Sequence, residues 1–440
     1  GVGGSVQYEL PQFLGIPGAT QGFIDAWGID ENGLDNLGAD RRALTPEEDF
    51  RGRVLGQHRQ RTDGGWQITG ELGLISDRNF LEQYYEREWD QEKDQVTGIE
   101  FKRLFDNSSF NVAGYFQVND FFTQTEWLPR VDYFQLGQPL FGDQVTWLSH
   151  SHVGYAKMEP ATRPLDPVDA AKFNPLRWEA EREGLRAGTR NELDFPVELG
   201  AVKVVPYVLG EAMHWGETLT GDEVTRLFGQ AGVRASLPMW RIDPSVQNVF
   251  FNLNGLAHKV VFEAEFSYAD ADQNLDTFPL YDPLDDDSQE HFRRRFVDDT
   301  FGGLPNVDNF VPIKFDERFF AFRSGMQSWV TAPSAEIVDD LMLLRLGARQ
   351  RWQTKRGIPG RYRIVDWMTL DLGASLFPEA DRDNFGSAAG LLNYDWRWHL
   401  GDRFTLTSDG FADVFSDGLR TVTLGGYTSR PERGSLYLGV

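Results

Sequence analysis

Two histidines two residues apart, His150 and His152, are the clearest candidates in the chain for chemistry at a metal or a nucleophile. In a strand, residues i and i+2 share a face, so both imidazoles would point the same way. A metal site needs a third ligand, and the sequence nominates none. The neighbouring Ser149 and Ser151 suggest a serine hydrolase, but no G-x-S-x-G motif and no acid partner accompany them. We therefore assign no catalytic residue, no metal ligand and no cofactor site.

A second candidate is an acidic cluster near residue 285. It consists of Asp282, Asp285, Asp286, Asp287 and Glu290, and the arginines at 293–295 follow it. Closely spaced carboxylates can bind a divalent cation, and arginines can bind phosphate. The spacing does not follow the EF-hand pattern, which has a glycine at its turn. We expect a solvated acidic loop whose arginines pair with the adjacent acids.

Composition narrows the class of protein that could position these residues. The 440 residues include 67 acidic and 43 basic side chains, for a net charge of -24, which argues against a nucleic-acid partner. There is no cysteine, and therefore no disulfide scaffold or thiolate metal site. No apolar run reaches the ~20 residues of a membrane helix. Two classes remain, a soluble all-β protein and a membrane barrel with interleaved apolar and polar residues.

Apolar and polar residues alternate along much of the chain, for example from Trp66 to Leu74 and from Leu392 to Leu400. The longest alternating runs cover roughly 66–76, 110–121, 144–157, 202–216, 341–353 and 363–377. Soluble strands average about 5–6 residues, whereas strands that cross a bilayer in a barrel need about 9–11. The pattern predicts about eighteen antiparallel strands that close into an outer-membrane type of β-barrel.

Short and long connections alternate between these strands. The short ones lie at 62–65, 106–109, 138–143 and 200–201, and the long ones at 77–95, 122–128, 158–185, 217–226 and 270–318. In outer-membrane barrels the short turns face the periplasm and the long loops face outward. We therefore expect extracellular loops near 77–95, 158–185 and 270–318, with a short helix in the second. Beyond about residue 378 the pattern places Gly401 and Asp402 on the long-loop side.

Five segments resemble one known family. They are SDRNFLEQYYEREWD at 76–90, FDNSSFNVAGYFQVNDFFTQTEWLPRVDYF at 105–134, NGLAHKVVFEAEFSYAD at 254–270, LYDPLDDDSQEHFRRRFVDDTFGG at 280–303 with FDERFFAFRSGMQSWV at 315–330, and LRLGARQRWQTKRG at 344–357. The resemblance is to the barrel domain of LptD, the LPS-assembly outer-membrane protein family, also called organic solvent tolerance protein. The 280–330 segment is the most specific. Phe262 and Phe266 depart from the family's proline and tyrosine, and Glu317 from its asparagine.

The resemblance implies a barrel in the bacterial outer membrane that receives lipopolysaccharide from a periplasmic bridge and inserts it into the outer leaflet. It also implies an LptE-like lipoprotein in the lumen and periplasmic Lpt bridge components as partners. The family's jelly-roll domain and linking cysteines are absent, so we interpret residues 1–440 as one barrel domain lacking its N- and C-terminal parts. The lateral-gate residues are not assigned.

The alternation assigns particular side chains to the two faces. We predict that the lipid-facing residues include Val112, Phe116, Leu344, Leu370 and Leu372. The predicted lumen-facing residues include Glu100, Lys102, Arg345, Arg349, Asp371 and Arg397. A charged lumen suits a hydrated, charged head group. The interpretation is transport without catalysis, and two alternatives stay open, a porin-like passive channel and a soluble β-rich carbohydrate-active protein.

Overall fold

The computed structural model describes residues 1–38, 41–173, 175–286, 316–358, 360–415 and 418–440. Nineteen strands form one antiparallel sheet in which neighbours in sequence are neighbours in space. The strands are β1 Val2–Phe13, β2 Ile16–Asp30, β5 Phe50–Thr62, β6 Trp66–Ile75, β7 Thr97–Leu104, β8 Ser108–Phe116, β9 Gln124–Leu140, β10 Val145–Glu159, β11 Glu183–Asp194, β12 Val197–Leu199, β13 Val202–Trp215, β14 Val224–Asn248, β15 Leu253–Ala271, β16 Leu341–Arg356, β17 Arg363–Leu376, β18 Ala389–His399, β19 Phe404–Asp413, β20 Arg420–Arg430 and β21 Gly434–Gly439. This confirms the predicted all-β, antiparallel fold of the outer-membrane barrel type.

The remaining elements are short and lie in the long connections. They are the strand pair β3 Asp35–Asn36 and β4 Arg42–Leu44, the helices α1 Phe80–Tyr84, α2 Glu86–Gln91, α3 Pro167–Lys172, α5 Glu317–Arg323 and α6 Ala380–Asp383, and the 3-10 turns η1 Leu275–Thr277 and η3 Met326–Ser328. The expected helix in 158–185 is confirmed as α3, where Asp166 caps the first turn by accepting from the Val168 N–H. Among the described residues, no helix has the length and apolarity needed to cross a membrane.

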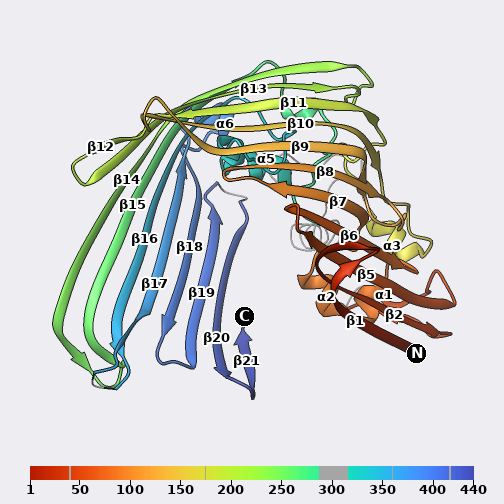
Figure 1. Cartoon of the computed structure of the whole chain (residues 1–440), viewed down its shortest axis with the longest axis horizontal. Coiled ribbons are helices and arrows are strands. Elements are labelled where there is room, and N and C mark those ends of the chain that lie inside the picture. The colour runs from red at the N-terminus through yellow and green to blue at the C-terminus, as the bar shows by residue number, and fades with distance from the viewer. Residues whose placement is uncertain (39–40, 174, 287–315, 359, 416–417) are drawn as a thin grey trace.

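The sheet curls into an open cylinder, and the edge strands β1 and β21 face each other across its gap (Figure 1). Within the described residues, β1 pairs with β2 and β21 pairs with β20. Strands β11 and β12 both pair with β13, so they form one pass that is interrupted at Phe195 and Pro196. A proline cannot donate to the ladder, which explains the break. The nineteen strands therefore make eighteen passes, as the alternation predicted.

Short turns and long connections alternate along the whole described chain. Every second connection is short, and in the turn after β5 the Gly65 N–H donates to the Thr62 carbonyl while Gly65 adopts a φ of 80°, which favours glycine. We call this side of the sheet the turn end and the opposite side the loop end. The prediction for Gly401 and Asp402 is wrong, because the connection 377–388 with α6 lies at the loop end and β18 then carries the chain back to the turn end. The predicted strand 110–121 also ends earlier, at Phe116.

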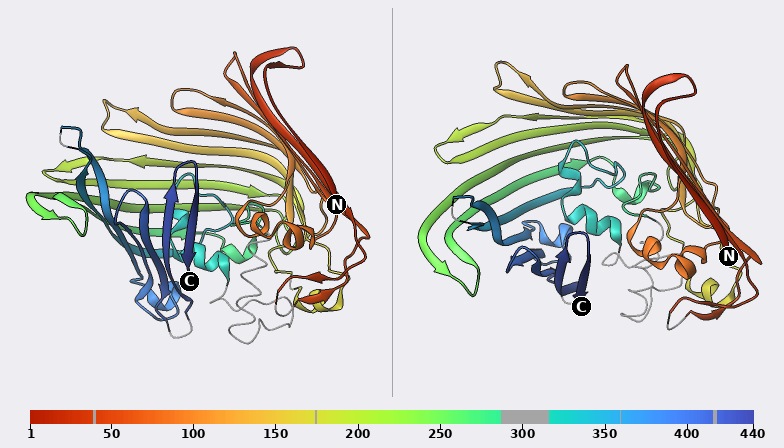
Figure 2. Two further views of the ribbon diagram at one scale, coloured as in Figure 1. Left: turned by 90° about the horizontal axis from the view of Figure 1, so that it is seen from below. Right: turned by 60° about the horizontal axis from the view of Figure 1, so that its bottom comes forward.

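The long connection 272–340 contains the loop predicted near 270–318, whose extracellular position stays a prediction. Its described parts, 272–286 and 316–340, lie inside the curve of the sheet, where α5 is visible in all views (Figures 1 and 2). Phe322, Val330 and Ile337 of this connection pack against the strand residues Leu209 and Phe228 in the largest buried apolar cluster. We call these described parts the inner segment. Burial of its apolar side chains, which the charge pattern of residues 280–303 obscured, explains the inward path.

Candidate functional site: the charged inner wall

Strand residues that face the inner segment form an inner wall of alternating arginines and carboxylates. Glu211 on β13 lies between Arg190 and Arg226, with its oxygens 2.9 Å from Arg190 Nε and 2.5 Å from Arg226 Nη2. Arg234 binds Glu192 at 2.5 Å and Glu265 at 3.2 Å. Because side chains alternate between faces in a strand, the i±2 spacing of these residues places them all on one surface.

The same arginines hold the backbone of the inner segment. Arg190 donates to the Trp329 carbonyl at 2.8 Å, Arg226 to Ala335 at 2.6 Å, and Arg234 to Ser328 at 2.9 Å. Each guanidinium therefore satisfies a wall carboxylate and an inner-segment carbonyl together. This double use fixes where the inner segment lies along the sheet.

Asp282 ties the other end of the inner segment to the wall. Its carboxylate lies 2.6 Å from Arg130 Nη1 on β9 and 2.8 Å from Arg186 Nη2 on β11, and Arg186 also pairs with Glu336 at 2.8 Å. The guanidiniums of Arg130 and Arg186 also lie over the ring of Trp127, 4.7 Å and 5.5 Å from its centroid. Burial disfavours the charged form of Asp282, but the two guanidiniums outweigh it and hold the pKa of Asp282 below its usual value.

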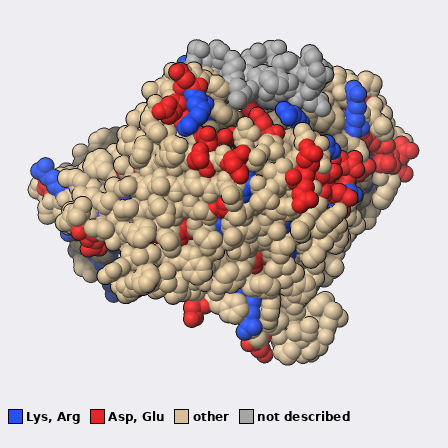
Figure 3. Space-filling view, turned by 90° about the horizontal axis from the view of Figure 1, so that it is seen from above, with Lys and Arg blue, Asp and Glu red and all other residues tan. Residues whose placement is uncertain are grey.

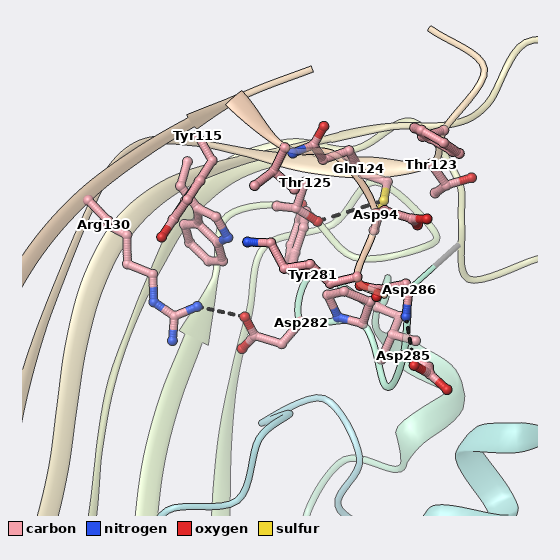
Figure 4. Close-up of a pocket in the computed structure, with 18 of the residues that line it drawn as sticks. Asp94, Tyr115, Thr123, Gln124, Thr125, Arg130, Tyr281, Asp282, Asp285 and Asp286 are labelled. Atoms are coloured by element: carbon pink, nitrogen blue, oxygen red, sulfur yellow. Dashed lines mark hydrogen bonds and ion pairs between the residues drawn. The ribbon is translucent and has the colours of Figure 1, made fainter. Parts of the chain in front are cut away.

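A cavity of about 470 Å³ opens beside this contact (Figure 4). Its lining combines aromatic rings with polar and acidic groups, among them Asp94, Tyr115, Gln124, Thr125, Tyr281, Asp282, Asp285 and Asp286. Burial raises the pKa of Tyr281, and the nearby Glu336 adds to that effect. Burial likewise raises the pKa of Asp286. The arrangement is suited to binding a polar or charged group.

The expectation of a solvated acidic loop is wrong for Asp282, which the inner wall buries between two arginines. Asp285 and Asp286 line the cavity instead. Asp287, Glu290 and the arginines at 293–295 lie outside the described residues, so their predicted pairing stays a prediction.

His150 and His152 point inward from β10, together with Asp132 on β9, and candidate ligand atoms of the three residues lie within 4.8 Å of one another. The sequence analysis missed Asp132 because it is 18 residues from His150 and only strand pairing brings them together. The register gives the reason, since Asp132 lies directly opposite His152. Ser149 and Ser151 point to the other face by alternation.

The structure places each residue of the predicted faces as follows. The outer face carries Val112, Phe116, Leu344, Leu370 and Leu372. Each of them lies opposite a residue of the neighbouring strand that also points away from the inner wall. The inner face carries Glu100, Lys102, Arg345, Arg349, Asp371 and Arg397. In the strand register Arg345 lies opposite Glu265, and Asp371 lies opposite both Arg349 and Asp395. Two inner arginines form wall pairs, Arg345 with Glu265 and Arg349 with Glu263. Contact of the outer set with lipid stays a prediction.

The outer face is apolar over most of its area. Its exposed large side chains include Leu72, Phe101, Val153, Val208, Phe266, Leu346, Leu372 and Leu424. Figure 3 shows this face above the upper strands of Figure 1 as a broad band with few charged atoms, and the charged side chains gather mainly at its margins. Exposed apolar surface of this extent marks a membrane or protein contact.

Sequence reasoning missed the buried wall residues Arg186, Arg190 and Arg226. A signal for these residues was present in the sequence. Arg186 and Arg190 are an even number of positions apart in one strand, and Glu211 is a charged residue among the apolar residues of the next strand. An even spacing of charges in a long strand indicates one shared face. It does not reveal burial, which depends on the inner segment.

Comparison with known proteins adds little to this geometry. No family model matches the chain, and no curated protein matches it. Among solved structures, the siderophore receptor PirA from Pseudomonas aeruginosa aligns with 98% of this chain and 78% of its own, at 12% identity and a TM-score of 0.21. A likeness at this TM-score supports no inference. The fold and the two contrasting faces by themselves define a barrel sheet of the outer-membrane type.

Proposed function

We propose that this chain forms the wall of a bacterial outer-membrane barrel that receives lipopolysaccharide from the periplasm and inserts it into the outer leaflet, without catalysis. The observation that carries the proposal is the contrast between an apolar outer face and an inner wall with charges of both signs. An amphiphile needs both surroundings, a polar path for its phosphorylated sugars and an apolar one for its acyl chains.

The distribution of exposure along the inner wall supports a path of this kind. At the loop end, the side chains of Arg186, Arg190 and Arg226 are 1%, 4% and 0% exposed. Toward the turn end, Arg349 is 59% and Arg397 is 57% exposed. The exposed half offers guanidiniums that a phosphate could bind bidentately. The buried half is filled by the inner segment, which disfavours an open passive channel.

The same distribution bears on partners. An LptE-like lipoprotein seated in the lumen would contact the exposed turn-end half, because the inner segment already covers the other. Under the proposed topology the turn end faces the periplasm, where such a lipoprotein and the bridge components would arrive. Both partners are part of the proposal.

Site-specific photo-crosslinking tests the proposal on two adjacent residues of β6. Thr69 faces Glu100 and the inner wall, and Ile68 faces Phe101 on the outer face. Both lie in the turn-end half of the strand, next to the inner leaflet under the proposed topology. A photoreactive residue at Thr69 should form lipopolysaccharide adducts in living cells, and one at Ile68 should not. Equal adducts at both positions, or none at Thr69, would refute the proposed route.

The alternative of a porin-like passive channel makes a different prediction. A passive channel would give steady ionic conductance in planar bilayers and no lipopolysaccharide adduct at Thr69. Because the inner segment occupies the loop end, we expect the purified chain to conduct poorly. High conductance without adducts would favour the channel.

A further inference from the structure

The inner faces of β9 and β10 bring three metal-ligating side chains together. Asp132 and His152 are directly opposite each other, and His150 is two residues along β10 on the same face. Directly opposed side chains in an antiparallel pair lie about 5 Å apart at Cβ, and i and i+2 share the surface. The candidate ligand atoms of all three residues lie within 4.8 Å of one another. Two strands thus aim two imidazoles and one carboxylate at a common point.

The second observation is an unsatisfied imidazole nitrogen. His152 is 6% exposed, and its Nε2 has no hydrogen-bond partner among the described residues. Buried polar atoms are nearly always hydrogen-bonded, and the exceptions call for an explanation such as a missing ion. His152 also lines a small cavity together with His150 and Asp282. The unpartnered nitrogen therefore belongs to a side chain that borders an internal space shared with His150.

The surroundings orient the other two side chains. His150 stacks on Phe134 with ring centroids 4.1 Å apart, and its Nε2 lies 2.8 Å from Asp132 Oδ1. Asp132 accepts from Arg130 Nε at 2.8 Å and Nη2 at 3.1 Å. Outer contacts of this kind fix the orientation of metal ligands. Of the nearby positive charges, Arg130 and Arg186 both pair with Asp282, and Arg186 also pairs with Glu336.

We propose that Asp132, His150 and His152 bind a divalent transition metal of the Zn²⁺ type on the inner wall. Imidazole nitrogens suit zinc, copper, iron and nickel, whereas calcium and magnesium prefer oxygen ligands. The metal would take the place of the hydrogen between His150 Nε2 and Asp132, and the His150 proton would move to Nδ1. Three protein ligands leave a fourth position for water or a further group. This proposal does not depend on which substrate the barrel transports.

The test uses the detergent-solubilised chain with a purification tag that lacks histidine. Equilibrium dialysis against Zn²⁺, with metal counted by mass spectrometry, should give about one ion per chain. His152→Ala and His150→Ala should each weaken binding at least about tenfold, the scale that loss of a supporting or direct ligand produces. His214→Ala is the matched control, because His214 lies on the opposite face of β13 and should leave binding unchanged.

Asp132→Asn keeps the shape of the site and removes its charge, so it tests the site where a truncated histidine might disturb the strand. It too should weaken Zn²⁺ binding, with heat-modifiable gel mobility retained as the sign of a folded barrel. X-ray absorption of the loaded protein should show two imidazoles in the first coordination shell. Absence of stoichiometric Zn²⁺, or equal binding by His152→Ala and His214→Ala, would overturn the proposal and leave adventitious binding only.

Discussion

Glu211 offers the sharpest test of how the inner wall is held together. Its carboxylate is fully buried between Arg190 and Arg226, at 2.9 Å and 2.5 Å. Glu211→Gln preserves the shape but removes the negative charge that these two guanidiniums share. Removing one partner of a buried ion pair costs about 3–5 kcal/mol, because the other charge stays buried and unpaired. Glutamine still offers one acceptor oxygen, so we expect a loss near the lower limit, about 3 kcal/mol.

The matched control is Glu263→Gln, also on the inner wall. Glu263 pairs with Arg349, but their side chains are 40% and 59% exposed. Water screens such a pair, and its loss should cost about 0–1 kcal/mol. Urea unfolding in phospholipid bilayers, followed by the fluorescence of the 13 tryptophans, measures both free energies. If the two variants differ by less than about 1 kcal/mol, the division into a buried and an exposed half of the wall is wrong.

Three further predictions test the faces, the topology and the loop end. Leu370→Arg should cost roughly 2–4 kcal/mol in bilayer unfolding if the outer face contacts lipid near the midplane, and Asp371→Asn, one residue along, far less; similar costs would contradict the alternation. In intact cells, a single cysteine at Leu165 should react with an impermeant maleimide and one at Asp106 should not; the reverse pattern would invert the barrel. Burial and a hydrogen bond to Glu31 raise the pKa of Tyr84 to about 12. The protonated form therefore contributes stability below pH 10, and this contribution is lost as the pH rises toward 12. Tyr84→Phe should abolish that loss in alkaline unfolding curves, and an unchanged curve would exclude this role.

The faces of the strands could be predicted from sequence because they depend on a local period of two. Leu370, Asp371 and Leu372 alternate in the chain, and nothing distant is needed to place them. The alternation of short and long connections is equally local, since turn residues such as Gly64 and Gly65 mark one end of each hairpin. It became uncertain near residue 378 because the sequence reasoning did not recognise 377–388 as a loop-end connection.

The buried half of the inner wall could not be predicted in the same way. Asp282 reaches Arg130 across 152 residues of sequence, and Arg190 reaches the Trp329 carbonyl across 139. A dense run of acids indicates solvent by composition alone. Asp282, the first acid of this run, lies between Arg130 and Arg186 because the sheet places β9 and β11 on the same inner surface.

The charges of the wall also explain why the inner segment has one position. Buried ion pairs are weak evidence for stability, because well-packed apolar residues of similar volume often do as well. An apolar wall would bury Phe322 and Val330 equally, but it would leave the segment free to slide along the strands. Guanidiniums that bind particular carbonyls, as Arg226 binds Ala335, remove that freedom. The same residue types lie exposed toward the turn end, where Arg349 pairs with Glu263 and Arg397 pairs with Asp395. One chemistry thus fixes a segment where the wall is covered and forms exposed ion pairs where it is open.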